Sequence, residues 1–226
     1  MKKLLSLATA ALFLVGCEQA FTLEGEDANV QEVTEKAPSE LVVGVSISTL
    51  NNPFFVSLEE GINNLAEENG TKIKSLDAQN DTAKQTNDVD DLIQQGVDIL
   101  LINPVDSSAI TPAVESANAK GIPVITIDRS SESGKILALV ASDNVEGGEI
   151  AAEYIKQISG ENVETVQLEG VPGASASRER GKGFMNIAEE SLNVIDSQTA
   201  NFDRAEGLTV MENMLQANPS INAVFA

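Results

Sequence analysis

The chain has 226 residues, 42% of them hydrophobic, and a formal net charge of −21 from 35 acidic and 14 basic side chains. This length allows one large or two small domains, and the acidity argues against binding to nucleic acid or anionic lipid, which a negative surface repels. The chain has no histidine and one cysteine, which excludes Ser-His-Asp and Cys-His catalysis, histidine metal ligands and an intrachain disulfide. We therefore expect a binding protein without cofactor or metal, not an enzyme.

Residues 1–40 are predicted to lie outside the folded part. "MKK" is a short positive segment, and the apolar run after it, residues 4–15, is too short to span a bilayer comfortably. The run ends in "LVGC", which resembles the lipobox of bacterial lipoproteins and predicts a lipoprotein signal peptide over residues 1–17 with Cys17 lipidated. The alternative is an ordinary signal peptide with an incidental cysteine. Residues 18–40 carry seven acidic side chains and one lysine without apolar periodicity, which is typical of a flexible tether.

The folded part is predicted to begin at Leu41 with a strand. "LVVGVSI" is a continuous β-rich run, as expected for a strand buried on both faces of a parallel sheet. Asn52 suits the cap and Pro53 the first turn of the helix that follows, and Gly70 suits its end. The chain therefore starts with one strand–helix unit.

The same unit then repeats. A second helix is predicted to begin after Asp81 or Thr82, and a third after Asp106 or Ser107. Terminating glycines fall at positions 70, 96 and 121, so the unit is about 25 residues long, the size of one β–α step. Further strands are predicted over residues 71–78, 97–104, 122–128, 136–143, 163–170, 192–200 and 221–226, and further helices over 145–158, 175–191 and 204–217.

The repeat predicts an α/β fold with two doubly wound parallel-sheet lobes. We expect an N-terminal lobe over residues 41–142 and a C-terminal lobe over residues 143–226. Ligands of open parallel sheets bind at the carboxyl ends of the strands, so the residues that follow each strand are the candidates for a site. They include all four arginines of the chain, which are Arg129, Arg178, Arg180 and Arg204.

The segment "STLNNPFF", residues 48–55, places two adjacent phenylalanines after a polar loop, in a chain with seven Phe, one Tyr and no Trp. No G-x-x-x-x-G-K-[ST] or G-x-G-x-x-G loop is present, which argues against a nucleotide site. Asn, Asp and Arg side chains can bridge the hydroxyls of a monosaccharide, and Phe rings can cover its C–H face. The plainer explanations are core packing for Phe54 and Phe55, a helix cap for Asn52, a solvated pair for Asp128 and Arg129, and helix-surface charge for Arg178 and Arg180.

Four motifs from Leu41 onward, "VSISTLNNPFFVSL", "LLINPVDSSAITPAVESANAKGIPVITIDR", "ASDNVEGGEIAAEYI" and "ASRERGKGF", resemble the periplasmic-binding-protein family. The resemblance implies two Rossmann-like lobes, periplasmic-binding-protein-like, that close around ribose or a related monosaccharide and then dock on the permease of an ABC transporter. It places ligand contacts at Ser48, Asn52, Phe54, Phe55, Asp128 and Arg129 in the N-terminal lobe and at Arg180 and Phe202 in the C-terminal lobe.

The resemblance also implies features that the 226 residues lack. In the family an Asn ligand directly follows the strand that matches "INAVFA", and an Asp ligand, a Gln ligand and the crossovers between the lobes come later. We therefore expect an incomplete C-terminal lobe and weak ribose binding by this chain alone. The predicted location is the periplasm or the cell surface, with the protein held on the membrane by its lipid.

Two other functions use the same lobes. One is a sugar-sensing input domain for chemotaxis or signalling, which would pass its signal to a chemoreceptor or a kinase. The other is a sugar-responsive repressor, which needs an N-terminal helix-turn-helix where this chain has its predicted signal peptide.

Overall fold

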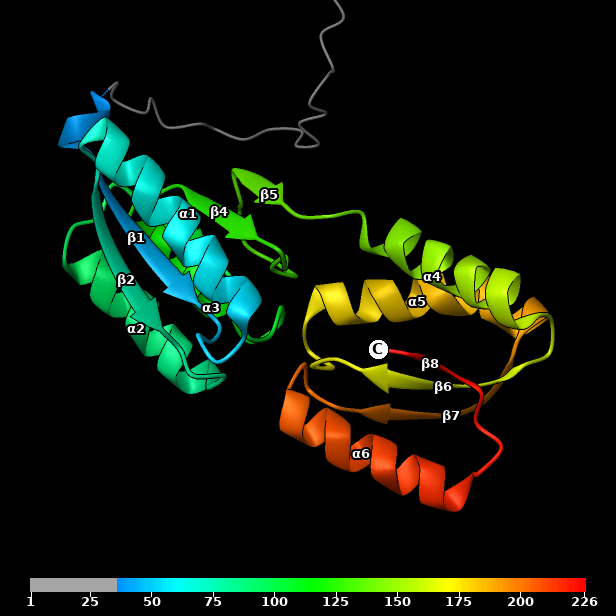
Figure 1. The fold of residues 1–226 in the computed structure, drawn as a ribbon. Helices are drawn as coiled ribbons and strands as arrows, with labels where there is room; N and C mark the ends of the chain where they lie inside the picture. The colour runs from blue at the N-terminus through cyan, green and yellow to red at the C-terminus, as the bar shows by residue number, and fades with distance from the viewer. Residues whose placement is uncertain (1–35) are drawn as a thin grey trace, which may run out of the picture. The chain divides into compact units, whose positions relative to one another are not determined.

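The computed structural model describes residues 36–226, in which strands and helices alternate as predicted (Figure 1). Cys17, the predicted signal peptide and most of the predicted tether lie outside the described residues. The elements are η1 (Pro38–Glu40), β1 (Val42–Ile47), α1 (Pro53–Asn69), β2 (Lys72–Asp77), α2 (Thr82–Gln94), β3 (Ile99–Ile102), α3 (Thr111–Ala119), β4 (Val124–Ile127), β5 (Ala138–Val140), α4 (Asn144–Ser159), β6 (Glu164–Glu169), α5 (Ser175–Ser191), β7 (Asn193–Thr199), α6 (Arg204–Ala217) and β8 (Ala223–Phe225).

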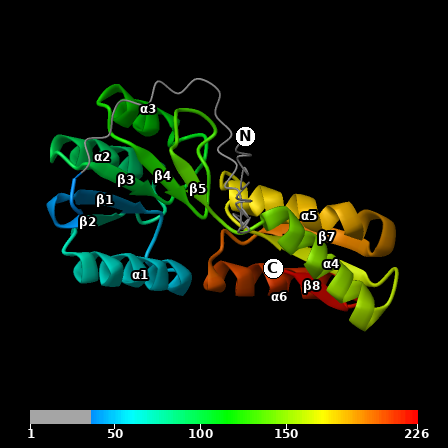
Figure 2. The ribbon, with the colours of Figure 1, turned by 90° about the horizontal axis from the view of Figure 1, so that it is seen from above.

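The N-terminal lobe is built on a five-stranded sheet in the order β2-β1-β3-β4-β5, and every pair of neighbours is parallel. Helix α1 covers one face, and α2 and α3 cover the other (Figure 2). The chain runs one way from β1 to β2 and the other way from β3 onward, so the order reverses at β1. A doubly wound sheet opens a crevice for ligands at such a reversal, beyond the carboxyl ends of its strands.

The C-terminal lobe has a three-stranded parallel sheet in the order β7-β6-β8. Helices α4 and α5 lie on one face of this sheet and α6 on the other (Figure 1). The rings of Phe184 on α5 and Phe225 on β8 stack with centroids 4.3 Å apart, which ties the helix layer to the sheet. The two separate parallel sheets confirm the predicted fold class.

Each sheet face of the N-terminal lobe has its own apolar cluster. Val45 and Ile47 of β1 pack with Phe55 beneath α1, and Leu92, Leu100 and their neighbours pack beneath α2 and α3. Both clusters come from the continuous apolar runs that identified the strands, because strands of a parallel sheet are buried on both faces.

The predicted helix ends are largely confirmed. The Asn52 side chain accepts a hydrogen bond from the Phe54 N–H and caps α1, and Asp81 caps α2 in the same way. Gly70 takes a left-handed conformation with φ of 72° after α1, which a glycine adopts without strain. In the described part of the chain, no helix combines the length and apolarity needed to cross a membrane.

The predicted start of the third helix is wrong. Helix α3 begins at Thr111, not after Asp106 or Ser107. Asp106 does accept hydrogen bonds from the Ser108 and Ala109 N–H groups, but it closes a turn that precedes the helix. Pro112 explains the delay, because a proline has no N–H to bond the Ser108 carbonyl, so an α-helix cannot include both residues.

Candidate functional site

A cavity of about 310 Å³ lies at the carboxyl ends of the strands, where loops from both lobes meet. The loops after β1, β2 and β4 contribute one side and the loop after β7 the other. Its volume is at the lower end of the range for small-molecule sites. The lining residues are Thr49, Asn51, Asn52, Pro53, Phe55, Asn80, Arg129, Asn201, Phe202, Asp203, Arg204 and Ala205.

Arg129 is the central side chain of the cavity wall. Its guanidinium carbon lies 5.1 Å from the ring centroid of Phe55 and 5.5 Å from that of Phe202, so one ring from each lobe flanks it. Only 2% of Arg129 is exposed. Its Nη1 donates to the carbonyls of Pro104 at 2.9 Å and Val105 at 3.4 Å, which fixes the plane of the guanidinium.

The Nε of Arg129 has no hydrogen-bond partner within residues 36–226, although it is buried. The Asp128 carboxylate forms an ion pair with it at 3.5 Å. Burial lowers the pKa of Arg129 below its ordinary value, and the charge of Asp128 opposes this shift. Since a buried donor without a partner is costly, the guanidinium is suited to donate to a bound acceptor.

Asp128 forms the centre of a tight turn after β4. Its φ is 64°, and the Arg129 N–H closes the turn on the Ile127 carbonyl at 2.7 Å. Left-handed backbone is uncommon for residues other than glycine and concentrates at functional sites. The turn places the Asp128 carboxylate 3.5 Å from Arg129 Nε, and of these two side chains only Arg129 lines the cavity.

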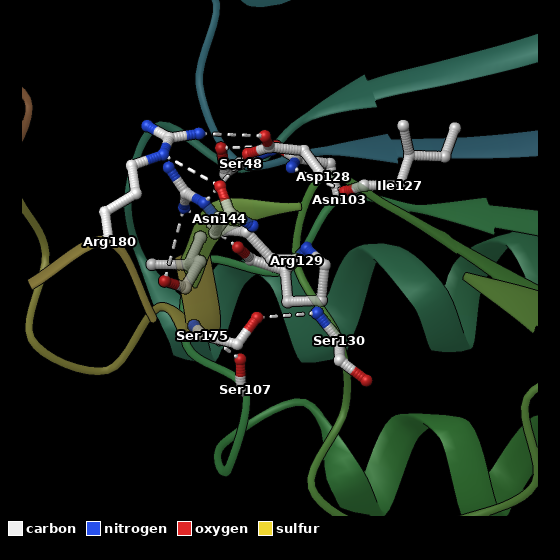
Figure 3. A network of polar contacts seen from close by, with 12 residues as sticks. Ser48, Asn103, Ser107, Ile127, Asp128, Arg129, Ser130, Asn144, Ser175 and Arg180 are labelled. Atoms are coloured by element: carbon white, nitrogen blue, oxygen red, sulfur yellow. Dashed lines mark hydrogen bonds and ion pairs between the residues drawn. The ribbon is translucent and has the colours of Figure 1, made fainter. Parts of the chain in front are cut away.

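Ser48 and Asn103 lie behind the cavity wall, both fully buried. The Asn103 Oδ1 accepts from the N–H and the hydroxyl of Ser48, at 3.2 and 2.6 Å, and its Nδ2 donates to the Ile127 carbonyl at 3.0 Å (Figure 3). Asn103 therefore links the ends of β1, β3 and β4. Ser48 does not line the cavity, and its hydroxyl is engaged by Asn103.

The C-terminal lobe contributes Arg180 and Phe202. The Arg180 Nε donates to Asn144 Oδ1 at 2.8 Å, and its Nη2 lies 3.7 Å from an oxygen of Asp128 in the other lobe (Figure 3). Arg180 also lies over the Phe202 ring, 5.8 Å from the centroid. Phe202 and Asn201 both have positive φ, 56° and 51°, so the loop after β7 is held in an unusual conformation that aims the ring at Arg129.

The two adjacent phenylalanines separate. Phe55 packs into the core and lines the cavity, whereas Phe54 is 57% exposed and is not among the lining residues. Their rings meet edge to face with centroids 5.3 Å apart. Asn52 caps α1 through Oδ1 and also lines the cavity, so its predicted ligand contact stays a prediction.

A polar seam joins the lobes beside the cavity. The Ser107 N–H donates to the Gly173 carbonyl at 2.9 Å, the Ser175 N–H donates to Ser107 Oγ at 3.1 Å, and the Ser130 N–H donates to Ser175 Oγ at 2.9 Å (Figure 3). Arg178 adds an ion pair with Glu132 at 2.8 Å, and both side chains are about half exposed. Arg178 thus belongs to the seam, while Arg180, two positions later, contacts Asn144, Asp128 and the Phe202 ring and is not among the residues that line the cavity.

Sequence reasoning missed several residues near the cavity. Asn80 lines it from the loop after β2, and Asn103 supports it from the end of β3. Both follow strands, so a search of every strand end would have found them. Thr49, Asn51, Asn201, Asp203 and Arg204 also line the cavity; they lie in the strand-end segments that are candidates for a site, although the resemblance places no ligand contacts at them.

The lining combines amide, carboxylate and guanidinium groups with two aromatic rings. Such a wall offers both donors and acceptors, which suits a polyhydroxylated ligand. Within residues 36–226, no group of three or more His, Cys, Asp or Glu side chains is placed to hold a metal ion.

Comparison with known proteins identifies a family. The pattern described as "periplasmic binding protein domain" matches residues 43–226. The chain is 64% identical over 187 residues to the ribose import binding protein RbsB of Bacillus subtilis (strain 168), covering 83% of this chain and 61% of that protein. It is 47% identical over 195 residues to RbsB of Escherichia coli (strain K12), covering 86% of this chain and 66% of that protein. The chain therefore spans somewhat less than two thirds of the length of these relatives.

A solved structure shares the fold. The fructose-binding periplasmic domain of a hybrid two-component system aligns with a TM-score of 0.79 and 32% identity, over 82% of this chain and 63% of that one. Both RbsB relatives are named as import binding proteins, in line with the expectation that this chain is not an enzyme.

Proposed function

Because the chain belongs to the periplasmic-binding-protein family, we propose that it captures ribose or a related monosaccharide outside the cytoplasm for an ABC importer. The ligand-binding residues in this proposal are Asn52, Phe55, Arg129 and Phe202 at the cavity, with Asp128 and Arg180 beside them. Delivery would take place at the permease of the importer, as the names of the RbsB relatives suggest.

The arrangement of Arg129 between Phe55 and Phe202 carries the proposal. One ring comes from each lobe, so a ligand that contacts the guanidinium and both rings would be held by both lobes at once. Sugar rings present hydroxyls at their edge and C–H groups on their faces, and these match a guanidinium donor and aromatic faces. The Arg129 guanidinium supplies charged N–H donors at the cavity wall, and hydrogen bonds to charged groups are stronger than those between neutral groups.

A ligand screen tests the proposal. The protein, completed with the C-terminal segment that its relatives have beyond the matched region, is heated with ribose, galactose, glucose, xylose or arabinose, from micromolar to millimolar sugar, because only binding to the native state raises the unfolding midpoint. We expect the largest rise with ribose and confirmation by titration calorimetry. If none of these sugars raised the midpoint or produced heat at millimolar concentration, the proposal would be wrong.

The membrane anchor is a separate part of the proposal and concerns residues outside the described range. We expect Cys17 to incorporate labelled fatty acid and to bring the protein into the membrane fraction. A Cys17→Ala variant should lose the label. Wild-type protein that is exported but unlabelled would contradict the anchor and leave the sugar site untouched.

A sensing role is the second candidate. The similarity to the fructose-binding domain of a hybrid two-component system supports it, because that domain uses the same fold for signalling. Deleting the gene separates the two functions. Loss of labelled ribose uptake indicates import, whereas normal uptake with a lost transcriptional or chemotactic response to ribose indicates sensing.

A further inference from the structure

We propose that Gln85, a residue of α2 that does not line the cavity, positions Arg129 by holding the loop to which the guanidinium is bonded. The inference rests on the proposed function, in which Arg129 binds the sugar. Gln85 would act without touching the ligand, through the backbone of residues 103–105.

Gln85 is a polar residue at a core position. It lies four residues before Val89 and seven before Leu92 on the buried face of α2, and only 1% of it is exposed. Helical spacing would ordinarily place an apolar residue there. Burying a carboxamide costs free energy unless hydrogen bonds replace those it makes to water, so its partners explain why it is tolerated.

The Gln85 side chain uses both ends of its carboxamide. Its Nε2 donates to the Asn103 carbonyl at 2.9 Å and to Ser46 Oγ at 3.2 Å, and its Oε1 accepts from the Val105 N–H at 2.8 Å. Only one orientation of the amide satisfies these partners, since a carbonyl cannot donate and an N–H cannot accept. Gln85 therefore clamps the backbone on both sides of Pro104.

The clamped segment is the one that binds Arg129. Sheet pairing of β3 ends at Ile102, and Pro104 has no N–H with which to continue it. The carbonyls of Pro104 and Val105 both accept from Arg129 Nη1. Without Gln85, the Val105 N–H and the Asn103 carbonyl would lose these bonds, and the two carbonyls that orient the guanidinium would no longer be fixed from the α2 side.

The Nε–H signals of the arginines provide a direct readout without any ligand. The chain has four arginines, so a ¹⁵N–¹H spectrum of their Nε–H groups is simple, and Arg129→Lys assigns the signal of Arg129. In Gln85→Met, which keeps the side-chain volume but removes the hydrogen bonds, we expect the Arg129 signal to shift or broaden while the other three stay. Gln94→Met, an exposed position on the same helix, is the control and should change none of them.

Calorimetry then tests whether the positioning of Arg129 by Gln85 affects ribose binding. In the protein completed with the C-terminal segment of its relatives, Gln85→Met should weaken ribose binding about tenfold, and Gln94→Met should not weaken it. Wild-type protein that binds no sugar would contradict the proposed function, whatever the spectra show. An unchanged Arg129 signal in Gln85→Met would overturn the positioning role, whatever the affinity.

A second variant covers the case in which Gln85→Met does not fold. Gln85→Glu is the second variant: burial favours the neutral acid, whose hydroxyl can donate to the Asn103 carbonyl while its carbonyl accepts from the Val105 N–H, so a smaller displacement of the Arg129 signal is expected. If both variants unfolded, Gln85 would be a residue of the core alone, and the inference would be wrong.

Discussion

The two lobes contribute to the cavity in different ways. The N-terminal lobe presents Arg129 from deep within its structure, on backbone held by Asn103 and Gln85. The C-terminal lobe lines the cavity with Phe202, from a loop with left-handed backbone, and the Arg180 side chain, which is 40% exposed, lies beside the cavity over the Phe202 ring. The difference indicates that the N-terminal half of the site is organised before a ligand arrives, whereas the C-terminal half takes part of its order from contacts across the cavity.

The largest expected effect concerns the aromatic pair in the N-terminal lobe. Phe55→Ala should lower the free energy of unfolding by about 3–5 kcal/mol, the usual cost of truncating a buried phenylalanine. Phe54→Ala, at the exposed neighbour, should cost less than about 1 kcal/mol. Urea unfolding of both variants measures the two values. Equal losses would mean that the exposed ring is also part of the core.

Arg129→Ala should be the most damaging change for sugar affinity. We expect a loss of about 1.5–3 kcal/mol or more, the range for hydrogen bonds to charged groups, which is roughly a 10- to 150-fold weaker dissociation constant. The carbonyls of Pro104 and Val105 would also lose their donor. Titration calorimetry with ribose decides the result, and an unchanged affinity would show that the organised half of the site does not bind the sugar.

The C-terminal lobe has a tight helix contact that a methyl group would disturb. A Cβ on Gly183 would lie 1.9 Å from the Val145 carbonyl oxygen, where α5 crosses α4. Gly183→Ala should therefore lower the free energy of unfolding by about 1–3 kcal/mol, the usual cost of overpacking.

Gly147→Ala is the matched control, because a Cβ there meets no atom within 4 Å. Helix propensity favours this alanine by up to about 1 kcal/mol. Thermal unfolding of both variants separates the two effects. Opposite signs are expected, and destabilisation of similar size at both positions would contradict the close contact.

Arg180→Ala tests the contribution of the C-terminal lobe to sugar binding. We expect sugar binding to weaken by about 1.5–3 kcal/mol, at the lower end because the side chain is partly exposed. Arg178→Ala removes an exposed ion pair with Glu132, which contributes at most about 1 kcal/mol. Its effect on sugar binding should therefore be smaller than that of Arg180→Ala. Calorimetry on both variants tests the assignment of Arg180, and equal losses at Arg178 and Arg180 would rule it out.

The smallest effect lies at the opposite end of the N-terminal lobe, where Asp98 precedes β3. Hydrogen bonds from Lys36 and from the Val42 N–H lower the pKa of Asp98. A lowered pKa in the folded state stabilises the protein above the ordinary aspartate pKa of about 4, and this stabilisation is lost as the pH falls through the folded value. Asp98→Asn should therefore be slightly less stable than wild type at neutral pH, and the gap should close as the pH falls through the lowered folded-state pKa of Asp98.

The measurement is denaturant unfolding of wild type and Asp98→Asn at several pH values. A gap that grew on acidification would contradict the sign of the pKa shift. Sugar affinity at neutral pH should be equal in the two proteins, because Asp98 lies beyond the amino end of β3 and the cavity lies at the carboxyl ends of the strands.

The sequence by itself determined the elements and their order. Continuous apolar runs identified the strands, and caps such as Asn52 and Asp81 located helix starts, because hydrophobic periodicity and capping are local properties. It failed at α3, where Pro112 delays the helix, although that proline was visible in the sequence. The rule that sites form at strand ends also placed Asn52, Phe55, Arg129 and Phe202 among the candidates, and all four line the cavity.

Only the tertiary structure decided which of the adjacent residues face the cavity. Phe54 and Phe55 are equivalent in sequence, but only Phe55 reaches both the β1 core and Arg129. Arg178 and Arg180 also have different partners, because residues two positions apart lie on nearly opposite sides of a helix: the first pairs with Glu132, and the second contacts Asn144 and Asp128. Gln85 has no signature in the sequence, since its partners are backbone groups eighteen and twenty residues away, and a hydrogen bond across that separation exists only after the strands have paired.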